Sequence, residues 1–223
     1  MIPFIDFHTH NYSNKIDVIE ILNLSFDNLE LLSKYCSIGI HPWFIDDDKI
    51  LYRLNQLSEF AIIKNIISIG EVGLDKFIDK NIDIQIKVFI NQVQISEKLS
   101  KPLTIHCVKA FNEIIALKKS LKPKMPWIIH GFNKSLQTAL SLTSSGFYIS
   151  FGESIFKDKI RTKKILDELP FDKLFFETDN SSKFSIEEIY IFVATLTGVS
   201  LSNLKEQIYH NFLTVFGNEF RLA

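Results

Sequence analysis

Apolar segments that end on a histidine or an acid recur along this 223-residue sequence, and this repeated pattern constrains its fold most. The clearest example is Ile66–Asp75 (IISIGEVGLD), in which a run of β-forming isoleucines stops at Gly70 and the carboxylate Glu71 follows at once. A carboxylate at the end of an apolar strand is costly to bury unless a partner compensates its charge. Glu71 therefore either faces water or lies against a positive centre.

Eight apolar runs predict strands, and most of them precede a segment whose apolar residues have helical spacing. The predicted strands are Ile2–Phe7, Ile16–Leu24, Tyr35–Ile40, Ile66–Asp75, Pro102–Ile105, Pro126–Ile129, Phe147–Phe151 and Lys173–Phe176. The predicted helices are Asn28–Lys34, Asp46–Asn65, Asn81–Ser100, Val108–Leu121, Ser135–Ser145, Asp158–Leu169, Ser185–Leu196 and Leu201–Phe216. This alternation predicts an α/β protein with a slightly trimmed (β/α)8 TIM barrel, formed by a single domain over residues 1–223.

The connection after the first predicted strand departs from this pattern. A parallel crossover needs about a dozen or more residues. The segment between Ile2–Phe7 and Ile16–Leu24 is shorter, and Asn11–Lys15 within it is a polar turn. Either the second strand pairs irregularly, or the usual helix has been trimmed away.

Composition excludes some partners and compartments. The net charge is −1, so no bulk positive field draws the protein to nucleic acid or to a membrane, and a nucleic-acid substrate needs a local basic or metal site. Hydrophobic residues make up 46% of the sequence, yet no apolar run reaches the roughly 18 residues of a membrane span. Met1–His10 lacks the pattern of a signal peptide. Cys36 and Cys107 lie in apolar runs, as expected for buried free thiols in a reducing compartment, so we expect a cytoplasmic protein. We expect it to be a monomer or a small homo-oligomer.

In a (β/α)8 barrel the active site lies at the carboxyl ends of the strands. The predicted strand ends carry His8, His10, His41, Glu71, His106, His130 and Asp179. Any one of these histidines is compatible with a structural role, but five of the six in the chain lie at such ends. Imidazoles and carboxylates that converge on one face predict a divalent metal site without thiolate ligands.

The number of these side chains predicts more than one ion. A catalytic site with one metal uses typically three protein ligands and a water. Four histidines with two carboxylates exceed that number, and a bridging carboxylate can hold two divalent ions about 3.5–4 Å apart. The ligand types suit Mg²⁺, Mn²⁺, Zn²⁺ or Fe²⁺ and do not choose among them.

Six segments together resemble the TatD family of metal-dependent hydrolases, within the wider group of amidohydrolase-like barrels. They are DFHTH (6–10), GIHPW (39–43), GEVGLD (70–75), PLTIHC (102–107), IIHGF (128–132) and ETD (177–179), with a weaker similarity in NFLTVFG (211–217). They occur in the family's order and span nearly the whole chain.

The resemblance implies a role for each predicted ligand. One ion would be bound by His8, His10 and Asp179, the second by His106 and His130, and Glu71 would bridge the two. The resemblance further implies that Asp179 and Glu71 are catalytic, with Asp179 as the general base that takes a proton from the attacking water.

Other positions match the surroundings of the family's metal site. His41 stands where the family contacts a substrate phosphate near the metals. Asp6 and Asp75 are expected to orient metal ligands, and Asp75 is equally compatible with a turn residue after Gly73. Cys107 is expected in the core, because adjacent residues of a strand face opposite sides.

The sequence departs from the family at two places that hold substrate. Where the family carries an arginine two residues after the fifth-strand histidine, this chain has Val108, followed by Lys109. After ETD the family continues with a small residue, proline and an arginine-bearing loop, but here Asn180–Lys183 follows. Either Lys109, Lys134 and Lys183 supply the positive charge of the missing arginines, or they are ordinary surface lysines.

Three functions are compatible with these observations. The first is a metal-dependent phosphodiesterase or deoxyribonuclease, acting on a frayed end or a short single strand because the net charge disfavours tight binding to long duplex DNA. The second is a hydrolase of a small ester, amide or lactone. The third is a metal-bound binding module without catalytic activity.

Overall fold

The computed structural model describes residues 2–27, 35–217 and 220 of the chain, which form eight β-strands and seven α-helices. The strands are β1 (Phe4–Thr9), β2 (Val18–Leu24), β3 (Tyr35–Ile38), β4 (Ile66–Asp75), β5 (Leu103–Val108), β6 (Trp127–Ile129), β7 (Tyr148–Phe151) and β8 (Leu174–Phe176). The helices are α1 (Ile50–Phe60), α2 (Ile82–Leu99), α3 (Phe111–Leu121), α4 (Leu136–Ser144), α5 (Lys159–Glu168), α6 (Ile186–Thr197) and α7 (Leu201–Phe216). The predicted helix Asn28–Lys34 lies outside the described residues.

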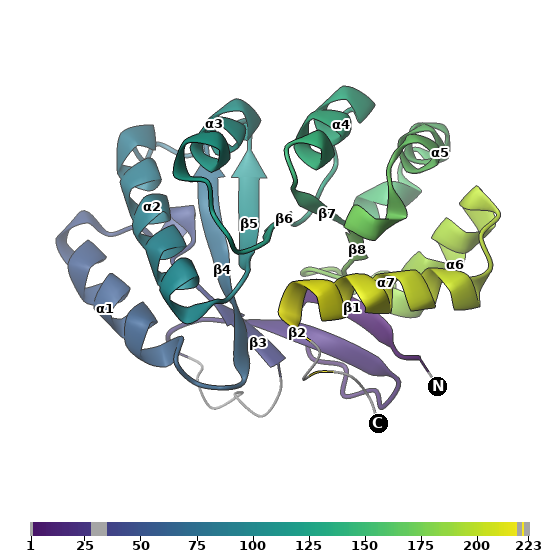
Figure 1. Cartoon of the computed structure of the whole chain (residues 1–223), viewed down its shortest axis with the longest axis horizontal. Helices are drawn as coiled ribbons and strands as arrows, with labels where there is room; N and C mark the ends of the chain where they lie inside the picture. Colours follow the sequence, from purple (N-terminus) through teal and green to yellow (C-terminus); the bar gives the residue numbers. More distant parts are fainter. Residues whose placement is uncertain (1, 28–34, 218–219, 221–223) are drawn as a thin grey trace. The chain divides into compact units, whose positions relative to one another are not determined.

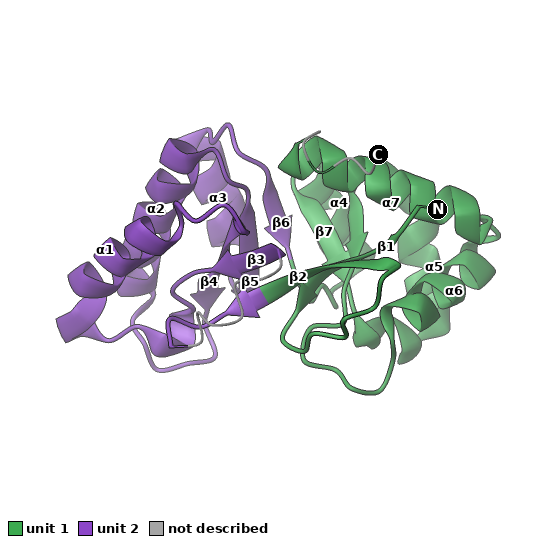
Figure 2. Ribbon diagram, turned by 90° about the horizontal axis from the view of Figure 1, so that it is seen from below, with its two compact units in different colours: residues 1–22, 130–223 green, residues 23–129 purple. Residues whose placement is uncertain are grey.

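Contacts divide the chain into two compact units (Figure 2). Unit 1 comprises residues 1–22 and 130–223, and unit 2 comprises residues 23–129. Each unit contains parallel strands and the helices that cover them, so each has an apolar core of its own.

Parallel strands of unit 1 bring the first and the last strand of the chain together. β7 pairs with β8 from Ile149↔Leu174 to Phe151↔Phe176, and a parallel bridge joins Thr9 of β1 to Asp179 after β8. α6 and α7 pack against β1, as Figure 1 shows in yellow-green and yellow. This pairing places the ends of β1 and β8 side by side.

The connection between β1 and β2 differs from a standard crossover in both ways that the sequence left open. Residues 10–17 are all described and contain no helix. β1 and β2 pair in parallel from Phe4↔Val18, but their register shifts between Asp6 and Thr9. The helix is therefore absent from this connection, and the strand pairing is irregular as well.

Large aromatic side chains fill the core of unit 1. The rings of Phe7 and Phe175 stack with their centroids 4.9 Å apart. Tyr190 of α6 is fully buried, and its hydroxyl accepts a hydrogen bond from the Ile5 amide at 3.2 Å and donates to the Ile5 carbonyl at 3.1 Å. One hydroxyl thereby satisfies both backbone groups of a residue on β1 and fixes α6 to that strand.

In unit 2, β3, β4, β5 and β6 pair in parallel in that order, and α2 lies against β4 (Figure 1). The fully buried face of α2 contains Phe89 and Val93, while Ile86 and Ile90 are half-buried. Gln85 and Gln92 are also buried on this helix, and both are hydrogen-bonded to the backbone of neighbouring segments. Through these glutamines, α2 holds neighbouring backbone by hydrogen bonds in addition to packing against β4.

The strands that carry candidate ligands are longer than their apolar runs. β4 runs past its isoleucines through Gly73 to Asp75, which are the bounds that the sequence predicts. A Cβ atom on Gly73, whose φ is +157°, would lie 1.9 Å from the carbonyl oxygen of His106, so only glycine fits beside the neighbouring strand. β5 likewise continues past His106 to Val108, and α3 therefore begins at Phe111 rather than at Val108.

Most other helix ends agree with the sequence. Ser200 caps α7 by accepting a hydrogen bond from the Asn203 amide at 3.2 Å, and Gly146 follows α4 with a φ of +77°. Asp46 caps a short 3-10 turn, so α1 begins only at Ile50.

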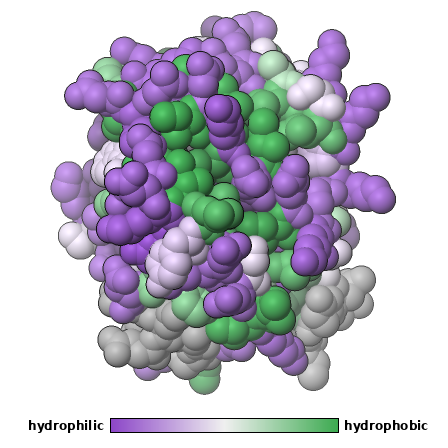
Figure 3. All heavy atoms as spheres, turned by 90° about the vertical axis from the view of Figure 1, so that its left-hand side faces the viewer, coloured by the Kyte–Doolittle hydropathy of each residue, from purple (hydrophilic) through white to green (hydrophobic). Residues whose placement is uncertain are grey.

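Helix α1 leaves apolar side chains exposed. Leu51 is 73% exposed and Tyr52 is 59% exposed. Figure 3 shows the side of the molecule that carries α1 in Figure 1, with hydrophobic surface between hydrophilic side chains. Among the described residues, no helix combines the length and the apolar character needed to cross a membrane.

Candidate metal centres

A first group of candidate ligands lies in unit 1. His8 belongs to β1, His10 follows it, and Asp179 follows β8. One ligand atom from each of His8, His130 and Asp179 lies within 4.8 Å of the others. Oδ1 of Asp179 is 3.7 Å from Nε2 of His8 and 3.5 Å from Nε2 of His10.

The backbone holds this group together. The Asp179 amide donates to the His8 carbonyl at 2.9 Å, and the His10 amide donates to the Asp179 carbonyl at 3.0 Å. Asp179 has a φ of +52°, a left-handed conformation that is uncommon outside glycine and is found at functional sites. The strand pairing thus fixes an aspartate between two histidines.

Glu177 orients His130, and it was not among the residues predicted from the sequence. It is fully buried, and its Oε1 accepts a hydrogen bond from the Gly131 amide at 2.6 Å and lies 3.6 Å from Nδ1 of His130. Burial alone would raise the pKa of Glu177, but the neighbouring imidazoles of His130 and His8 outweigh it and hold that pKa below its usual value. In the sequence, Glu177 stands two residues before the predicted ligand Asp179 in ETD (177–179), and this proximity could have identified it.

Asp6 contacts the loop rather than a histidine. Its carboxylate accepts hydrogen bonds from the Thr178 amide at 2.9 Å and from the Thr178 hydroxyl at 2.6 Å. Burial raises the pKa of Asp6 to about 8, against the opposing effect of these bonds. Asp6 therefore positions the segment between Glu177 and Asp179.

A second group lies in unit 2 and consists of His41, Glu71 and His106, with one ligand atom of each within 4.8 Å of the others. Oε2 of Glu71 is 3.7 Å from Nε2 of His41 and 3.8 Å from Nδ1 of His106. The sequence placed Glu71 either in water or against a positive centre, and it is 7% exposed between two imidazoles.

Asn23 fixes the other oxygen of Glu71 and was not predicted. Its Nδ2 donates to Glu71 Oε1 at 3.0 Å, and the Ser37 hydroxyl donates to Asn23 Oδ1 at 3.1 Å. This chain of bonds leaves Oε2 directed at the histidines. An amide inside the apolar run of β2 was the only sign of it in the sequence.

Asp75 connects three groups in unit 2. Its Oδ2 lies 3.3 Å from Nε2 of His106 and accepts a hydrogen bond from the Trp43 indole at 2.8 Å. Its Oδ1 accepts one from the Phe77 amide at 2.8 Å. Burial would raise the pKa of Asp75, but the indole, the amide and His106 together hold it below its usual value. Asp75 thus orients His106 and also forms the turn with Phe77.

Two glutamines of α2 hold the backbone beside these ligands. Gln92 accepts a hydrogen bond from the Ile40 amide at 2.6 Å and donates to the Ile40 carbonyl at 3.1 Å, next to His41. Gln85 binds the amide and carbonyl of Asp75 in the same manner, at 2.8 and 2.9 Å. The helix therefore positions both loops through four backbone hydrogen bonds.

The three lysines considered as substitutes for arginine have different surroundings. The amine of Lys183 lies 3.3 Å from Glu153, so an acid compensates its charge. The amine of Lys109 lies 3.8 Å from the centre of the Phe77 ring. Lys134 lines a pocket of about 290 Å³ in unit 1.

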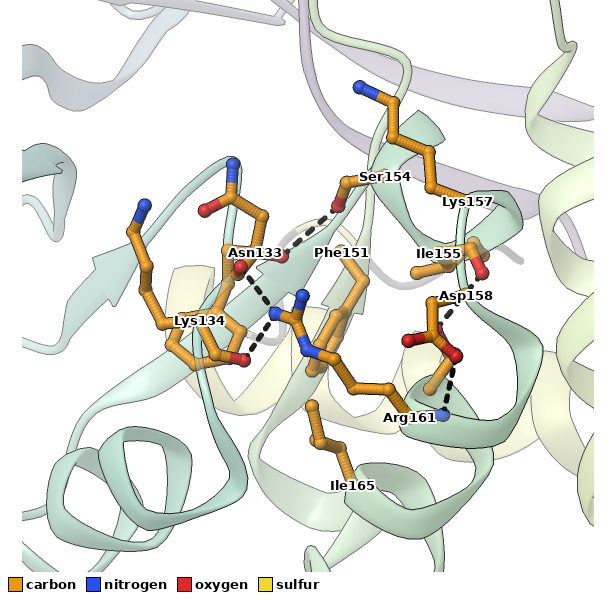
Figure 4. A pocket seen from close by; sticks show the side chains of 11 residues that line it. Asn133, Lys134, Phe151, Ser154, Ile155, Lys157, Asp158, Arg161 and Ile165 are labelled. Carbon is orange, nitrogen blue, oxygen red and sulfur yellow. Dashed lines mark hydrogen bonds between the residues drawn. The ribbon is translucent and has the colours of Figure 1, made fainter.

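Three basic side chains, Lys134, Lys157 and Arg161, contribute to the lining of this pocket (Figure 4). The Arg161 guanidinium donates to the carbonyls of Asn133 and Lys134, the latter at 2.5 Å. The amines of Lys134 and Lys157 extend to the same side in Figure 4, and neither forms an ion pair within the described part of the chain. Asp158 caps α5 through the Arg161 amide at 2.9 Å. The three basic side chains of the lining outnumber its one acid, Asp158, so the pocket carries net positive charge.

The chemistry of both groups fits divalent ions. Imidazole nitrogens with carboxylate oxygens are ligands for zinc, manganese and iron, and they need no thiolate. Cys107 is buried and belongs to neither group. The structure brings His130 to His8 and Asp179, and it brings His41 to Glu71 and His106. The assignment of all six ligands to two ions stays a prediction.

Comparison with known proteins relates the chain to hydrolases. The family model described as TatD related DNase matches residues 9–217. The uncharacterized metal-dependent hydrolase YabD of Bacillus subtilis is 34% identical over 149 residues, which are 65% of this chain and 58% of that protein. The matched region is thus less than two thirds of YabD. The uncharacterized metal-dependent hydrolase YcfH of Escherichia coli is 27% identical over 81% of this chain and 72% of its own length.

Solved structures share the fold. The crystal structure of YjjV, a TatD homologue from Escherichia coli, superimposes with a TM-score of 0.82 at 20% identity, over 97% of this chain and 99% of that one. A hydrolase of the TatD family from Entamoeba histolytica gives a TM-score of 0.75 at 17% identity, over 96% and 98%. The predicted α/β class and (β/α)8 barrel are confirmed.

Proposed function

Because this chain belongs to the TatD DNase family of metal-dependent hydrolases, we propose that it hydrolyses phosphodiester bonds, as a deoxyribonuclease, with two divalent ions. The observation that carries this proposal is the presence of two ligand groups, His8–His130–Asp179 and His41–Glu71–His106. A structural role would account for one buried histidine, but two separate clusters of imidazole and carboxylate need another explanation.

The proposed ligand sets follow the family's pattern. His8, His10 and Asp179 would hold one ion, His106 and His130 the other, and Glu71 would serve both. Bound ions would lower the pKa of a water and stabilise the negative charge that develops on the phosphoryl oxygens. His41 would contact the substrate phosphate, and its proximity to Glu71 also suits it as a further ligand.

Residues of the chain would provide the proton transfer and the positioning. The Asp179 side chain is 44% exposed, so water and substrate can reach its carboxylate, which would take a proton from the attacking water. Asp6 holds the neighbouring Thr178 through two hydrogen bonds, and Glu177 fixes His130. Asp75 orients His106 in the same way.

Charge distribution favours a short or single-stranded substrate. A net charge of −1 offers little of the nonspecific attraction that long duplex DNA requires. Lys134 and Lys109 form no ion pair in the described parts of the chain and would supply local point charges to phosphates. We expect the reaction in the cytoplasm, on the sequence grounds given above.

The experiment combines metal analysis with a nuclease assay. Purified protein loaded with Mg²⁺, Mn²⁺ or Zn²⁺ is analysed by elemental mass spectrometry and incubated with single- and double-stranded DNA. We expect two ions per chain and metal-dependent release of nucleotides, faster from single strands. Intact DNA in every metal-loaded sample would refute the nuclease function, and absence of bound metal would refute the site itself.

A second candidate is hydrolysis of a small ester, amide or lactone. It is favoured by Val108 and Asn180–Lys183, which stand where the family has substrate-binding arginines. The same metal-loaded protein would then turn over small carbonyl substrates and leave phosphodiesters intact. Turnover of any substrate would exclude the third possibility, a binding module without catalysis.

A further inference from the structure

Exposed aromatic side chains stand in the two loops that follow β3 and β4. Trp43 is 61% exposed and Phe77 is 68% exposed, although aromatic side chains usually gain by burial. Both residues follow carboxyl ends of strands, where His41 also lies. The ring of Trp43 has its centroid 5.0 Å from that of His41 and 6.0 Å from that of His106. We call Trp43 and Phe77 the aromatic rim.

Asp75 holds both members of the rim in place. Its Oδ2 accepts the indole hydrogen bond of Trp43 at 2.8 Å, and its Oδ1 accepts the Phe77 amide at 2.8 Å. The same Oδ2 lies 3.3 Å from His106. One buried carboxylate therefore fixes two exposed aromatic residues relative to a candidate metal ligand. Side chains that were merely tolerated at the surface would not need such a support.

Lys109 adds positive charge to the rim. Its amine lies 3.8 Å from the centre of the Phe77 ring, a cation–π contact. Lys109 has a φ of +52°, so its backbone adopts a left-handed conformation that a lysine seldom takes. No carboxylate within the described residues pairs with this amine. The rim thus combines flat apolar rings with an uncompensated cation.

We propose that the aromatic rim is a stacking site for an unpaired nucleobase next to the His41–Glu71–His106 group, with Lys109 beside the phosphate of the same nucleotide. This inference rests on the proposed nuclease function and names the part of the substrate that the site recognises. Every base presents a π face to an aromatic ring, so stacking selects unpaired bases without selecting a sequence. A base within a duplex keeps both faces covered and cannot stack on the rim.

The chain provides its own optical probe for this site. It contains two tryptophans, the exposed Trp43 and Trp127, which is fully buried. Full-length protein as purified is titrated with a trideoxyadenylate whose phosphorothioate linkages resist hydrolysis, and tryptophan emission is recorded. The comparison ligand is an abasic trimer with the same phosphorothioate charges. We expect the adenine trimer to quench Trp43 and to bind at least about fivefold more tightly than the abasic trimer.

Three variants assign the signal to the rim. Trp43→Phe leaves only Trp127, so the emission should no longer respond to either trimer. Phe77→Ala should weaken binding of the adenine trimer by about fivefold or more and leave binding of the abasic trimer unchanged. Ile62→Ala is the matched control: Ile62 is 69% exposed but precedes β4, whereas Phe77 follows it, and both affinities should stay at the wild-type value.

The outcomes separate the rim from the nuclease function. Equal affinities for the two trimers, or binding without a change in Trp43 emission, would overturn the rim even if the same preparation degrades DNA. Base-dependent quenching would support the rim even if no DNA is degraded, and would then refute only the proposed reaction. Absence of binding by either trimer would also overturn the rim, and the hydrolysis assay would judge the nuclease function separately.

Discussion

Oε1 of the fully buried Glu177 lies 3.6 Å from Nδ1 of His130 and accepts a hydrogen bond from the Gly131 amide at 2.6 Å. A carboxylate that contacts one nitrogen of an imidazole fixes the orientation of the ring and makes the other nitrogen a better ligand. The ordinary cost of burying this charge is offset by His130, which is why the pKa of Glu177 lies below its usual value. His130 and Glu177 therefore act as a pair.

Replacement of Glu177 by glutamine tests this pair. Glu177→Gln keeps the acceptor for the Gly131 amide but removes the charge beside His130, so metal affinity should fall by about 10- to 100-fold while the fold survives. Titration against a chelator measures the affinity, and circular dichroism checks the fold. Glu168→Gln, an exposed position of α5, serves as control and should bind metal normally. Unchanged affinity in Glu177→Gln would show that the pair has no influence on metal.

The candidate ligands could be recognised in the sequence because they follow local patterns. His8, His41, Glu71 and His106 were identified from apolar runs that end on them, and the glycine requirement in GEVGLD is likewise a local feature. Their supports were not predictable in this way. Glu177 acts on His130 across 47 positions of sequence, and Asn23 acts on Glu71 across 48. Only the strand pairing brings such residues together.

The ends of strands and the buried residues of helices were hard to predict for a similar reason. Ile86 and Ile90 are apolar residues of α2, yet Gln85 and Gln92 are more deeply buried because they satisfy the backbone groups of Asp75 and Ile40. β5 continues past His106 because β4 pairs with it as far as Val108. A single sequence shows the polar side chains, and it does not show which backbone groups they must satisfy.

Asp179→Asn should remove most of the activity and leave the fold intact. General bases contribute about 10²- to 10⁴-fold to a rate, and this substitution deletes a base and a charged ligand together. Asparagine tolerates the left-handed backbone at φ +52°, so the hydrogen bonds to His8 and His10 should persist. Kinetics with the preferred metal and a thermal melt measure both effects. Near-normal turnover would show that the assigned base is wrong, and Asp167→Asn provides an exposed control.

Glu71→Gln should lower the occupancy of both ions. The substitution places a neutral amide opposite His41 and His106, and the loss in affinity should be at least about tenfold. Elemental analysis after dialysis gives the number of ions per chain for the variant, for wild type and for the exposed control Glu59→Gln. Loss of one ion alone would mean that Glu71 serves only that ion, and the bridging role would be wrong.

Tyr190→Phe should destabilise the protein without affecting metal binding. The variant keeps the ring that packs on Phe4 and Phe176 but leaves the Ile5 amide and carbonyl without the hydroxyl. An unsatisfied buried polar group costs about 1–3 kcal/mol, which corresponds to a decrease in Tm of several degrees. Urea unfolding measures the difference, with Tyr52→Phe at the surface as control. Equal stability of the two variants would mean that water replaces the hydroxyl at no cost.

The pair Lys15–Glu187 predicts a dependence of stability on pH. The Lys15 amine lies 2.6 Å from Glu187 Oε1, and the hydrogen bond that it donates to Glu187 raises the pKa of Lys15. Burial would raise the pKa of Glu187, but the bond to Lys15 outweighs it, so this pKa is lowered. A lowered carboxylate pKa gives stability that is fully present above the usual glutamate value and is lost as the pH falls through the folded-state value.

Lys15→Met should therefore be less stable than wild type at neutral pH, by less than about 1 kcal/mol because both side chains are partly exposed. The difference should shrink in acid as Glu187 takes up a proton, and it should shrink in high salt because screening weakens the attraction. Urea unfolding at about pH 7 and about pH 3.5, with and without 1 M salt, measures both trends. Lys164→Met, at an exposed position of α5, should show neither trend. A deficit that stays the same in acid would assign the effect of Lys15 to its methylene groups rather than to its charge.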